Sequence, residues 1–223
     1  MKLLIRQGRL VDPVGGIGGV MDILLEDGRV AVIGSNLRDQ EAQIIDARGL
    51  VVCAGLVDMH VHLREPGLEY KETIATGCAA AAAGGFTSIA PMPNTRPATD
   101  CPEQVRYVLE KAAAACGVHV FPIGAVTMGE KGEELTDAEA LKRAGVAALS
   151  DDGMPVQNAN LMRDALIRAH RQNLTVLSHC EDADMVKNYA VNEGRISRQL
   201  RLEGRPAIAE EIMVMRDAML AEE

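Results

Sequence analysis

The sequence is poor in aromatic residues: they make up only 2% of its 223 residues, and there is no Trp. A hydrophobic core must therefore be built from Ala, Val, Leu, Ile and Met. No apolar run approaches the ~20 residues that a membrane-spanning helix requires. The first residues also lack the apolar region of a signal peptide. We therefore expect no membrane partner.

A surplus of basic residues is absent as well. The formal net charge is -9, from 23 Lys and Arg against 32 Asp and Glu. A nucleic-acid binder needs a basic face to neutralise phosphates, so this balance argues against a nucleic-acid partner. Hydrophobic residues make up 48% and charged residues 25%, which is typical of a folded globular protein.

Paired cysteine motifs are also missing. The five cysteines are widely spaced, and none belongs to a CxxC pair: Cys53, Cys78, Cys101, Cys116 and Cys180. This pattern indicates neither a zinc knuckle nor a disulfide scaffold. Scattered thiols on apolar segments are usually core residues in a reducing compartment, so we expect a cytoplasmic protein.

Two kinds of segment follow one another along the chain. Residues 1–54 contain short β-rich runs, with a hairpin signal at Asp27-Gly28. From about residue 50, buried strand runs alternate with helical stretches, which predicts an α/β fold with a parallel sheet. We count five strand–helix units, whereas a closed (β/α)₈ barrel has eight in ~250 residues. We therefore predict two domains, 1–54 and 55–223, with an incomplete barrel in the second.

The last predicted helix supports this reading. Four apolar residues fall on one helical face, namely Ile208, Ile212, Met215 and Met219. The sequence then stops on two glutamates without a glycine cap, and acids are unfavourable at the negative end of a helix dipole. We expect the 223 residues to be a piece of a longer protein, inactive by itself.

A metal site is suggested by the stretch DMHVHLREPG, residues 58–67. Side chains alternate along a strand, so His60 and His62 point the same way, about 7 Å apart, and both can hold one metal ion. Alone, this pair could equally be a polar strand end. Further ligands are available at later strand ends, in SDDG (150–153) and at His179 in LSHC (177–180). Asp and His suit zinc and related divalent ions.

Other polar residues near these strand ends have two readings each. Arg64 offers a planar fork for a carboxylate, or it forms a surface ion pair with Glu65 or Glu69. Asn94 in PMPNT (91–95) is a substrate-binding amide or an ordinary turn residue. The remaining histidines, at positions 119 and 170, are expected to be structural or solvent-facing.

With these residues in view, the sequence resembles the dihydroorotase family of the amidohydrolase superfamily, specifically its longer, bacterial-type class. The resemblance rests on DMHVHLREPG, MPNT (92–95), SDDG and LSHCED (177–182), and it extends to EGRPAIAEE (203–211). It implies a TIM-like (β/α)₈ barrel with a small β-sandwich. It also implies reversible, zinc-dependent closure of N-carbamoyl-L-aspartate to L-dihydroorotate in pyrimidine synthesis.

The resemblance also implies residue roles. His60 and His62 would bind a first zinc ion, and His179 would belong to a second metal position. Asp152, favoured over Asp151 because it lies nearer the loop end, would be the catalytic metal-bridging ligand. Arg64 and Asn94 would bind the substrate carboxylate. The family's proton-transferring aspartate, and a further metal-binding histidine, are expected beyond residue 223.

The resemblance leaves alternatives in function and partners. A hydantoinase or allantoinase would keep the metal chemistry and change the substrate. Hydantoinases and dihydropyrimidinases share the HxH motif but typically bridge two metals with a carbamylated lysine, where this sequence has Asp. A non-catalytic subunit that partners aspartate transcarbamoylase is a third reading, although such proteins usually lose metal ligands. A homodimer is expected for the longer protein. Asp58 is either a hydrogen-bonding partner of the metal ligands or a structural acid.

Overall fold

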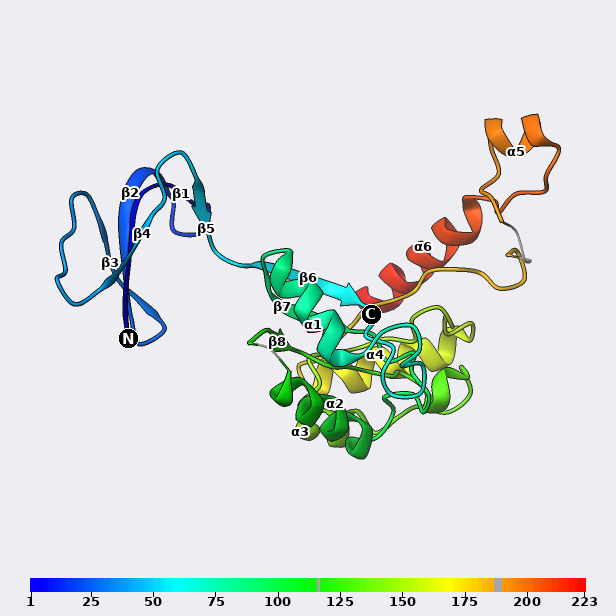
Figure 1. The fold of residues 1–223 in the computed structure, drawn as a ribbon. Coiled ribbons are helices and arrows are strands. Elements are labelled where there is room, and N and C mark those ends of the chain that lie inside the picture. Colours follow the sequence, from blue (N-terminus) through cyan, green and yellow to red (C-terminus); the bar gives the residue numbers. More distant parts are fainter. Residues whose placement is uncertain (116, 187–189) are drawn as a thin grey trace. The chain divides into compact units, whose positions relative to one another are not determined.

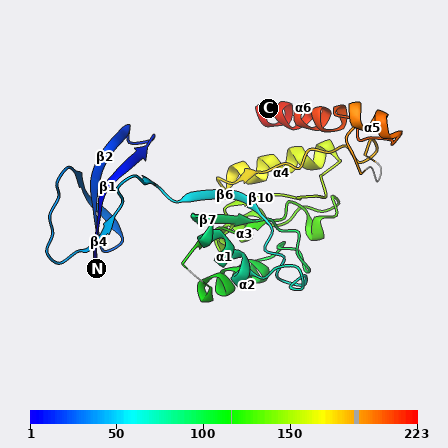
Figure 2. The same ribbon diagram turned by 45° about the horizontal axis from the view of Figure 1, so that its top comes forward.

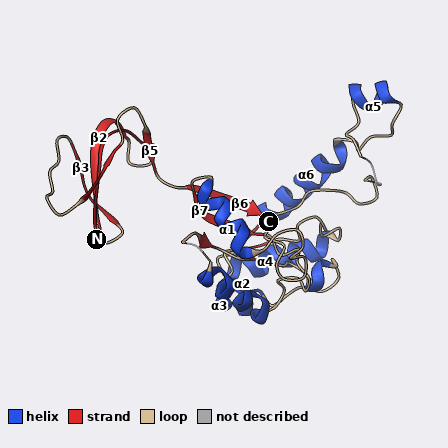
Figure 3. Cartoon of the chain, in the orientation of Figure 1, coloured by secondary structure: helices blue, strands red, loops and turns tan. Residues whose placement is uncertain are grey.

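The computed structural model of the chain describes residues 1–115, 117–186 and 190–223. It divides into two compact units, Met1–Gly55 and Leu56–Glu223. Figure 3 shows only strands and loops in the first unit and both helices and strands in the second. Among the described residues, no helix is long and apolar enough to cross a membrane.

The first unit is a five-stranded sheet (Figure 1). Its strands are β1 (Lys2–Asp12), β2 (Ile17–Glu26), β3 (Arg29–Gly34), β4 (Gln43–Asp46) and β5 (Val51–Cys53). β2 pairs antiparallel with both β1 and β3, whereas β4 and β5 pair parallel with successive parts of β1. The predicted hairpin is confirmed: Glu26 pairs with Arg29 across Asp27 and Gly28, whose φ angles are 49° and 78°. Positive φ at both turn residues favours this Asp-Gly sequence.

The second unit alternates strands and helices, which confirms the predicted α/β fold (Figure 1). Its elements in order are β6 (Leu56–Val61), α1 (Ile74–Ala83), β7 (Phe86–Pro91), α2 (Pro102–Ala114), β8 (His119–Val120), β9 (Ile123–Gly124), a 3₁₀ turn (Met128–Glu130), α3 (Ala138–Ala144), β10 (Ala148–Leu149), α4 (Ala159–Arg171), β11 (Thr175–Val176), α5 (Arg195–Leu200) and α6 (Ile208–Glu222).

All strand pairs in this unit are parallel. β6, β7 and β8 form one sheet, and β9, β10 and β11 form another. β8 and β9 follow each other directly and are separated only by Phe121 and Pro122. The Phe121 amide still donates to Ile89, and the Pro122 carbonyl accepts from Ala147, so this segment links the two sheets. The carboxyl ends of all these strands therefore lie on the same side.

Local sequence signals set the helix boundaries. Thr73 caps α1 through a hydrogen bond from the Thr76 amide, and Pro102 occupies the start of α2, where its missing N–H costs nothing. Asp137 and Asn158 cap α3 and α4. The buried hydrophobic residues are all aliphatic, Met or Cys, as the low aromatic content requires. Of the cysteines, Cys78 is buried and Cys53 is exposed, whereas Cys116 lies outside the described residues.

The last helix, α6, packs against α4 (Figure 2). It buries Ala209 and Met213. The predicted apolar face stays exposed by 44–66%, and its members are Ile208, Ile212, Met215 and Met219. The expected unfavourable acidic end is relieved in part, because both carboxylate oxygens of Glu223 lie 2.7 Å from the Arg163 guanidinium.

Candidate metal centre

The carboxyl ends of three strands bring the predicted metal ligands together. His60 lies near the end of β6 and His62 directly follows it. Asp152 follows β10, and His179 follows β11. Because parallel strands end on the same side, ligands far apart in sequence meet there.

Asp152 is the centre of this group. One carboxylate oxygen, Oδ1, lies 3.4 Å from His60 Nε2 and 3.4 Å from His179 Nδ1, and the other, Oδ2, lies 3.6 Å from His62 Nε2. Ligand atoms of His60, His62 and Asp152 all lie within 4.8 Å of one another, so these three could hold one metal ion. His179 also contacts the Asp152 carboxylate but does not belong to this group of three.

The charge around Asp152 also fits a cation. Its side chain is only 8% exposed, yet no Lys or Arg among the described residues lies within 4.0 Å of its carboxylate. A buried carboxylate normally has a cationic partner or a metal. Two imidazoles and one carboxylate form a donor set that zinc accepts.

Asp151 and Asp152 have different surroundings. The Asp151 carboxylate is buried and accepts hydrogen bonds from the amides of Val126 (2.7 Å) and Thr127 (3.1 Å) and from the Thr127 hydroxyl. These contacts fasten the loop after β9 to the end of β10. The structure therefore places Asp152, and not Asp151, among the histidines. Asp58 accepts a hydrogen bond from the His60 amide at 3.1 Å.

Arg64 lies directly after the histidine pair, and its guanidinium makes no hydrogen bond or ion pair with any described residue. Its expected alternative partners are engaged elsewhere: Glu65 pairs with Lys111 (3.2 Å), and Glu69 accepts from the Gly67 amide (2.8 Å). The guanidinium is therefore available to an external anion.

A buried glutamate anchors the loop that carries Arg64. Glu65 accepts hydrogen bonds from the Ile74 amide (2.9 Å) and the Tyr107 hydroxyl (3.0 Å), and it pairs with Lys111. Burial raises the pKa of the Glu65 carboxyl, but the contacts with Ile74, Lys111 and Tyr107 outweigh it, so the pKa lies below its usual value. Arg64 itself has φ of 62°, a region that residues with a Cβ rarely adopt. The Glu65 contacts therefore hold an unusual backbone turn.

The loop that carries Asn94 is tied to the Arg64 loop. The Arg96 amide donates to the Pro66 carbonyl at 2.9 Å. Gly67 lies so close that a Cβ there would be 2.0 Å from the Arg96 carbonyl oxygen, so only glycine fits. Asn94 reaches the candidate metal ligands, donating to Asp152 Oδ2 at 2.8 Å and contacting His62 Nδ1 at 3.1 Å.

Glu130 is a buried acid that sequence reasoning missed. It lies in the turn after β9, is 7% exposed, and its Oε1 has no hydrogen-bond partner among the described residues. Burial, followed by repulsion from Asp151, Asp152 and Asp100, raises the pKa of Glu130 to about 8. The only sequence signal was an acid between glycines after a predicted strand.

The Glu130→Gln variant should be more stable than the wild type at alkaline pH. An unfolded Glu titrates near pH 4.3, so between about pH 4.3 and 8 the folded protein keeps a proton that the unfolded chain releases. Wild-type stability should therefore fall with rising pH relative to the variant, by up to about 1.4 kcal/mol per unit. Denaturation of the metal-free proteins at about pH 5 and pH 8 measures this; a difference that does not grow with pH contradicts it.

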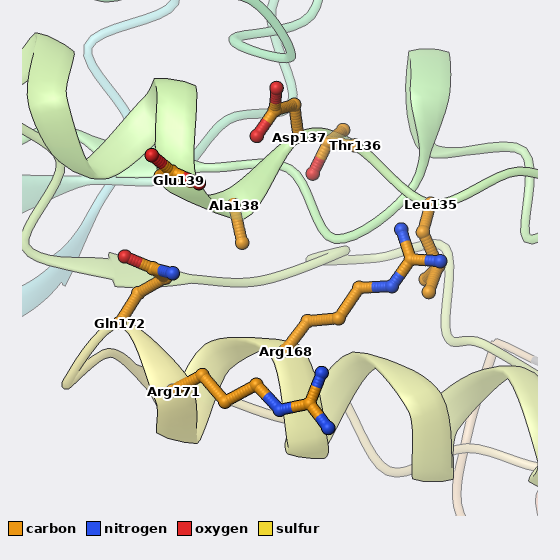
Figure 4. A pocket seen from close by; sticks show the side chains of 8 residues that line it. All are labelled: Leu135, Thr136, Asp137, Ala138, Glu139, Arg168, Arg171 and Gln172. Carbon is orange, nitrogen blue, oxygen red and sulfur yellow. The ribbon is translucent and has the colours of Figure 1, made fainter.

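A separate surface hollow of about 380 Å³ lies between the start of α3 and the end of α4 (Figure 4). Arg168 and Arg171 extend into it from α4, opposite Asp137 and Glu139. None of the predicted site residues lines it. The other two histidines are exposed; His119 lies in β8 and His170 in α4.

Comparison with known proteins adds independent observations. A family model described as dihydro-orotase-like matches residues 49–223. Dihydroorotases of Solibacter usitatus and Citrifermentans bemidjiense are 47% and 51% identical to this chain over 222 and 223 residues. These alignments cover 100% of this chain but 52% and 53% of the relatives, so the chain spans about half their length.

Solved structures share the fold. An L-hydantoinase (dihydropyrimidinase) from Arthrobacter aurescens superposes with a TM-score of 0.80 at 22% identity, over 99% of this chain and 50% of that protein. A D-hydantoinase (dihydropyrimidinase) from a Thermus species gives a TM-score of 0.70 at 26% identity, with the same coverage.

The family match spans 175 of the 223 residues, from 49 to 223, and includes every residue of the Asp152-centred group. It agrees with the motifs at the strand ends and with the dihydroorotases that are 47% and 51% identical in sequence over the full chain. The chain therefore belongs to the dihydro-orotase-like family.

Proposed function

We propose that the protein is a zinc-dependent dihydroorotase, which closes N-carbamoyl-L-aspartate to L-dihydroorotate with loss of water, and catalyses the reverse reaction. The observation that carries this proposal is the group of His60, His62 and Asp152, with ligand atoms within 4.8 Å at the ends of parallel strands. The dihydroorotases that are 47% and 51% identical to this chain over its full length support the proposal.

The proposed enzyme is a complete (β/α)₈ barrel with a small β-sandwich, of which residues 55–223 and 1–54 supply parts. The solved relatives that share the fold are about twice as long as this chain, which supports the larger architecture. We place the proton-transferring aspartate outside the 223 residues. Dimerisation of the complete protein, its location in the cytoplasm and any contact with aspartate transcarbamoylase belong to the same proposal.

His60, His62 and Asp152 would hold a first zinc ion, and Asp152 with His179 would contribute to a second position. Zinc in such a site lowers the pKa of water towards about 7 and polarises a carbonyl group. The Asp152 carboxylate suits a role shared by both positions because it lies within 3.4–3.6 Å of His60, His62 and His179.

Arg64 is proposed to bind the substrate carboxylate, because its guanidinium pairs with no described residue and Arg64 follows His62 by two residues. Replacing Arg64 with Ala should raise KM for dihydroorotate by roughly 10–100-fold, since a charge-assisted hydrogen bond contributes about 1.5–3 kcal/mol. Arg64→Lys should recover little, because Lys lacks the bidentate fork. Steady-state kinetics measures KM, and the zinc content of each variant shows that the metal site is intact. An unchanged KM would show that Arg64 does not bind the substrate.

Turnover of dihydroorotate and of hydantoin by the complete protein tests the proposed function. The expected result is activity on dihydroorotate and little on hydantoin. Hydantoinase is the second candidate because solved hydantoinases share the fold. Asp152 disfavours it, since the central carboxylate here belongs to an unmodified side chain. A protein that binds zinc but does not turn over dihydroorotate would refute the proposal.

A further inference from the structure

Asn94 touches two of the proposed metal ligands at once. Its side-chain nitrogen Nδ2 lies 2.8 Å from Asp152 Oδ2 and 3.3 Å from the Asp152 carbonyl oxygen. Its oxygen Oδ1 lies 3.1 Å from His62 Nδ1. These contacts come in addition to the substrate-binding role that the family resemblance implies for Asn94.

The chemistry of these partners fixes the orientation of the Asn94 amide. A carboxylate oxygen and a carbonyl oxygen can only accept hydrogen bonds, so the NH₂ group must face Asp152. The opposite orientation would place the Asn94 oxygen against two acceptors. Consequently Oδ1 faces His62, and because Oδ1 can only accept, the hydrogen between the two residues belongs to His62 Nδ1.

The loop that carries Asn94 is well anchored. Pro93 is fully buried, and its carbonyl oxygen accepts from the Thr99 amide at 3.1 Å. Two residues after Asn94, the Arg96 amide donates a hydrogen bond to the Pro66 carbonyl. Asn94 is therefore presented to His62 by fixed backbone.

We propose that Asn94 is a positioning residue that holds neutral His62 in its Nδ1–H form and so keeps the Nε2 lone pair directed at the metal position. His62 Nε2 lies 3.6 Å from Asp152 Oδ2, so in this form two acceptor atoms face each other. At that distance Nε2 makes no hydrogen bond with Asp152, whereas Nδ1 lies 3.1 Å from Asn94 Oδ1, so the Asn94 contact selects the ring nitrogen that carries the hydrogen. The role rests on the proposed metal binding by His62. A second hydrogen bond that fixes the ring form and orientation of a metal-binding histidine is a general device.

The ring form can be measured without metal or substrate. In the complete protein, freed of metal, labelled with ¹⁵N-histidine and held at about pH 8.5, an ordinary imidazole is neutral. Nitrogen chemical shifts, assigned with the His62→Ala variant, should show His62 protonated at Nδ1. In Asn94→Leu, which has a similar shape and no hydrogen-bonding atoms, this preference should disappear. A wild-type His62 protonated mainly at Nε2, or identical spectra for both proteins, would overturn the proposal.

Zinc affinity provides a second readout. Asn94→Leu should bind zinc about 10–100-fold more weakly in competition with a chelator, as for other partners of metal ligands. Thr95→Val is the matched control, because it removes contacts with the Pro93 and Pro97 carbonyls and none with His62 or Asp152. Equal affinity of Asn94→Leu and wild type contradicts the positioning role. If His62→Ala also binds as wild type does, the proposed metal role of His62 fails, and the nitrogen shifts still decide the role of Asn94.

Discussion

Replacing Asp152 with Asn should abolish stable zinc binding and lower turnover of dihydroorotate by on the order of 10³-fold, the scale of losing a central electrostatic group. The Asp152 carboxylate lies 3.4–3.6 Å from His60, His62 and His179, so the substitution changes the group that all three histidines share. The amide of Asn is neutral and has a single oxygen, so it offers neither the negative charge nor the second ligand oxygen of the carboxylate. Metal analysis of the purified protein and kinetics measure both effects.

Asp151→Asn is the matched control. Its carboxylate accepts from Val126 and Thr127, so the amide should weaken the fold by about 1–3 kcal/mol. Zinc binding should be retained. The opposite pattern, with zinc lost in Asp151→Asn and retained in Asp152→Asn, would reverse the assignment of the two aspartates.

Replacing Glu65 with Ala should lower the free energy of unfolding by about 2–4 kcal/mol, because the buried Ile74 amide and the partly buried Tyr107 hydroxyl lose their acceptor. Denaturant unfolding of the complete protein measures the loss. Arg64 should also be less well placed, so KM for dihydroorotate should rise in the folded variant.

Two comparisons separate the causes of this loss. Lys111→Ala removes only a partner that is 51% exposed and should cost about 1 kcal/mol or less. Because the Glu65 pKa is lowered on folding, its charge stabilises the protein above the unfolded value of about 4.3, and this contribution is lost as pH falls below it. A Glu65→Ala protein as stable as Lys111→Ala at neutral pH would show that the buried contacts contribute little.

Residues whose role depends on strand position could be predicted from the sequence. His60 and His62 share a face because of strand alternation, and later polar residues at parallel strand ends had to meet them. The α/β fold and the hairpin at Asp27-Gly28 could also be predicted, because turn residue types and hydrophobic periodicity are local features of the sequence. Asp152 was favoured over Asp151 because it lies nearer the loop end, and the structure places Asp152 next to His60 and His62.

Features that depend on side-chain rotamers and on contacts between loops could not be predicted. Nothing in PMPNT indicates that Asn94 would bridge His62 and Asp152, since that geometry needs three loops placed together. The burial of Glu130 depends on the turn after β9. The exposed apolar face of α6 is a further example. Helical periodicity identifies this face but does not show whether another part of the protein packs against it.

X-ray diffraction at the zinc absorption edge, from crystals of the complete zinc-loaded protein, tests the metal centre most directly. We predict an anomalous peak in contact with His60 Nε2, His62 Nε2 and the Asp152 carboxylate, and its loss in Asp152→Asn. A peak bound by other residues, or none at this position in a protein that turns over dihydroorotate, would contradict the assignment.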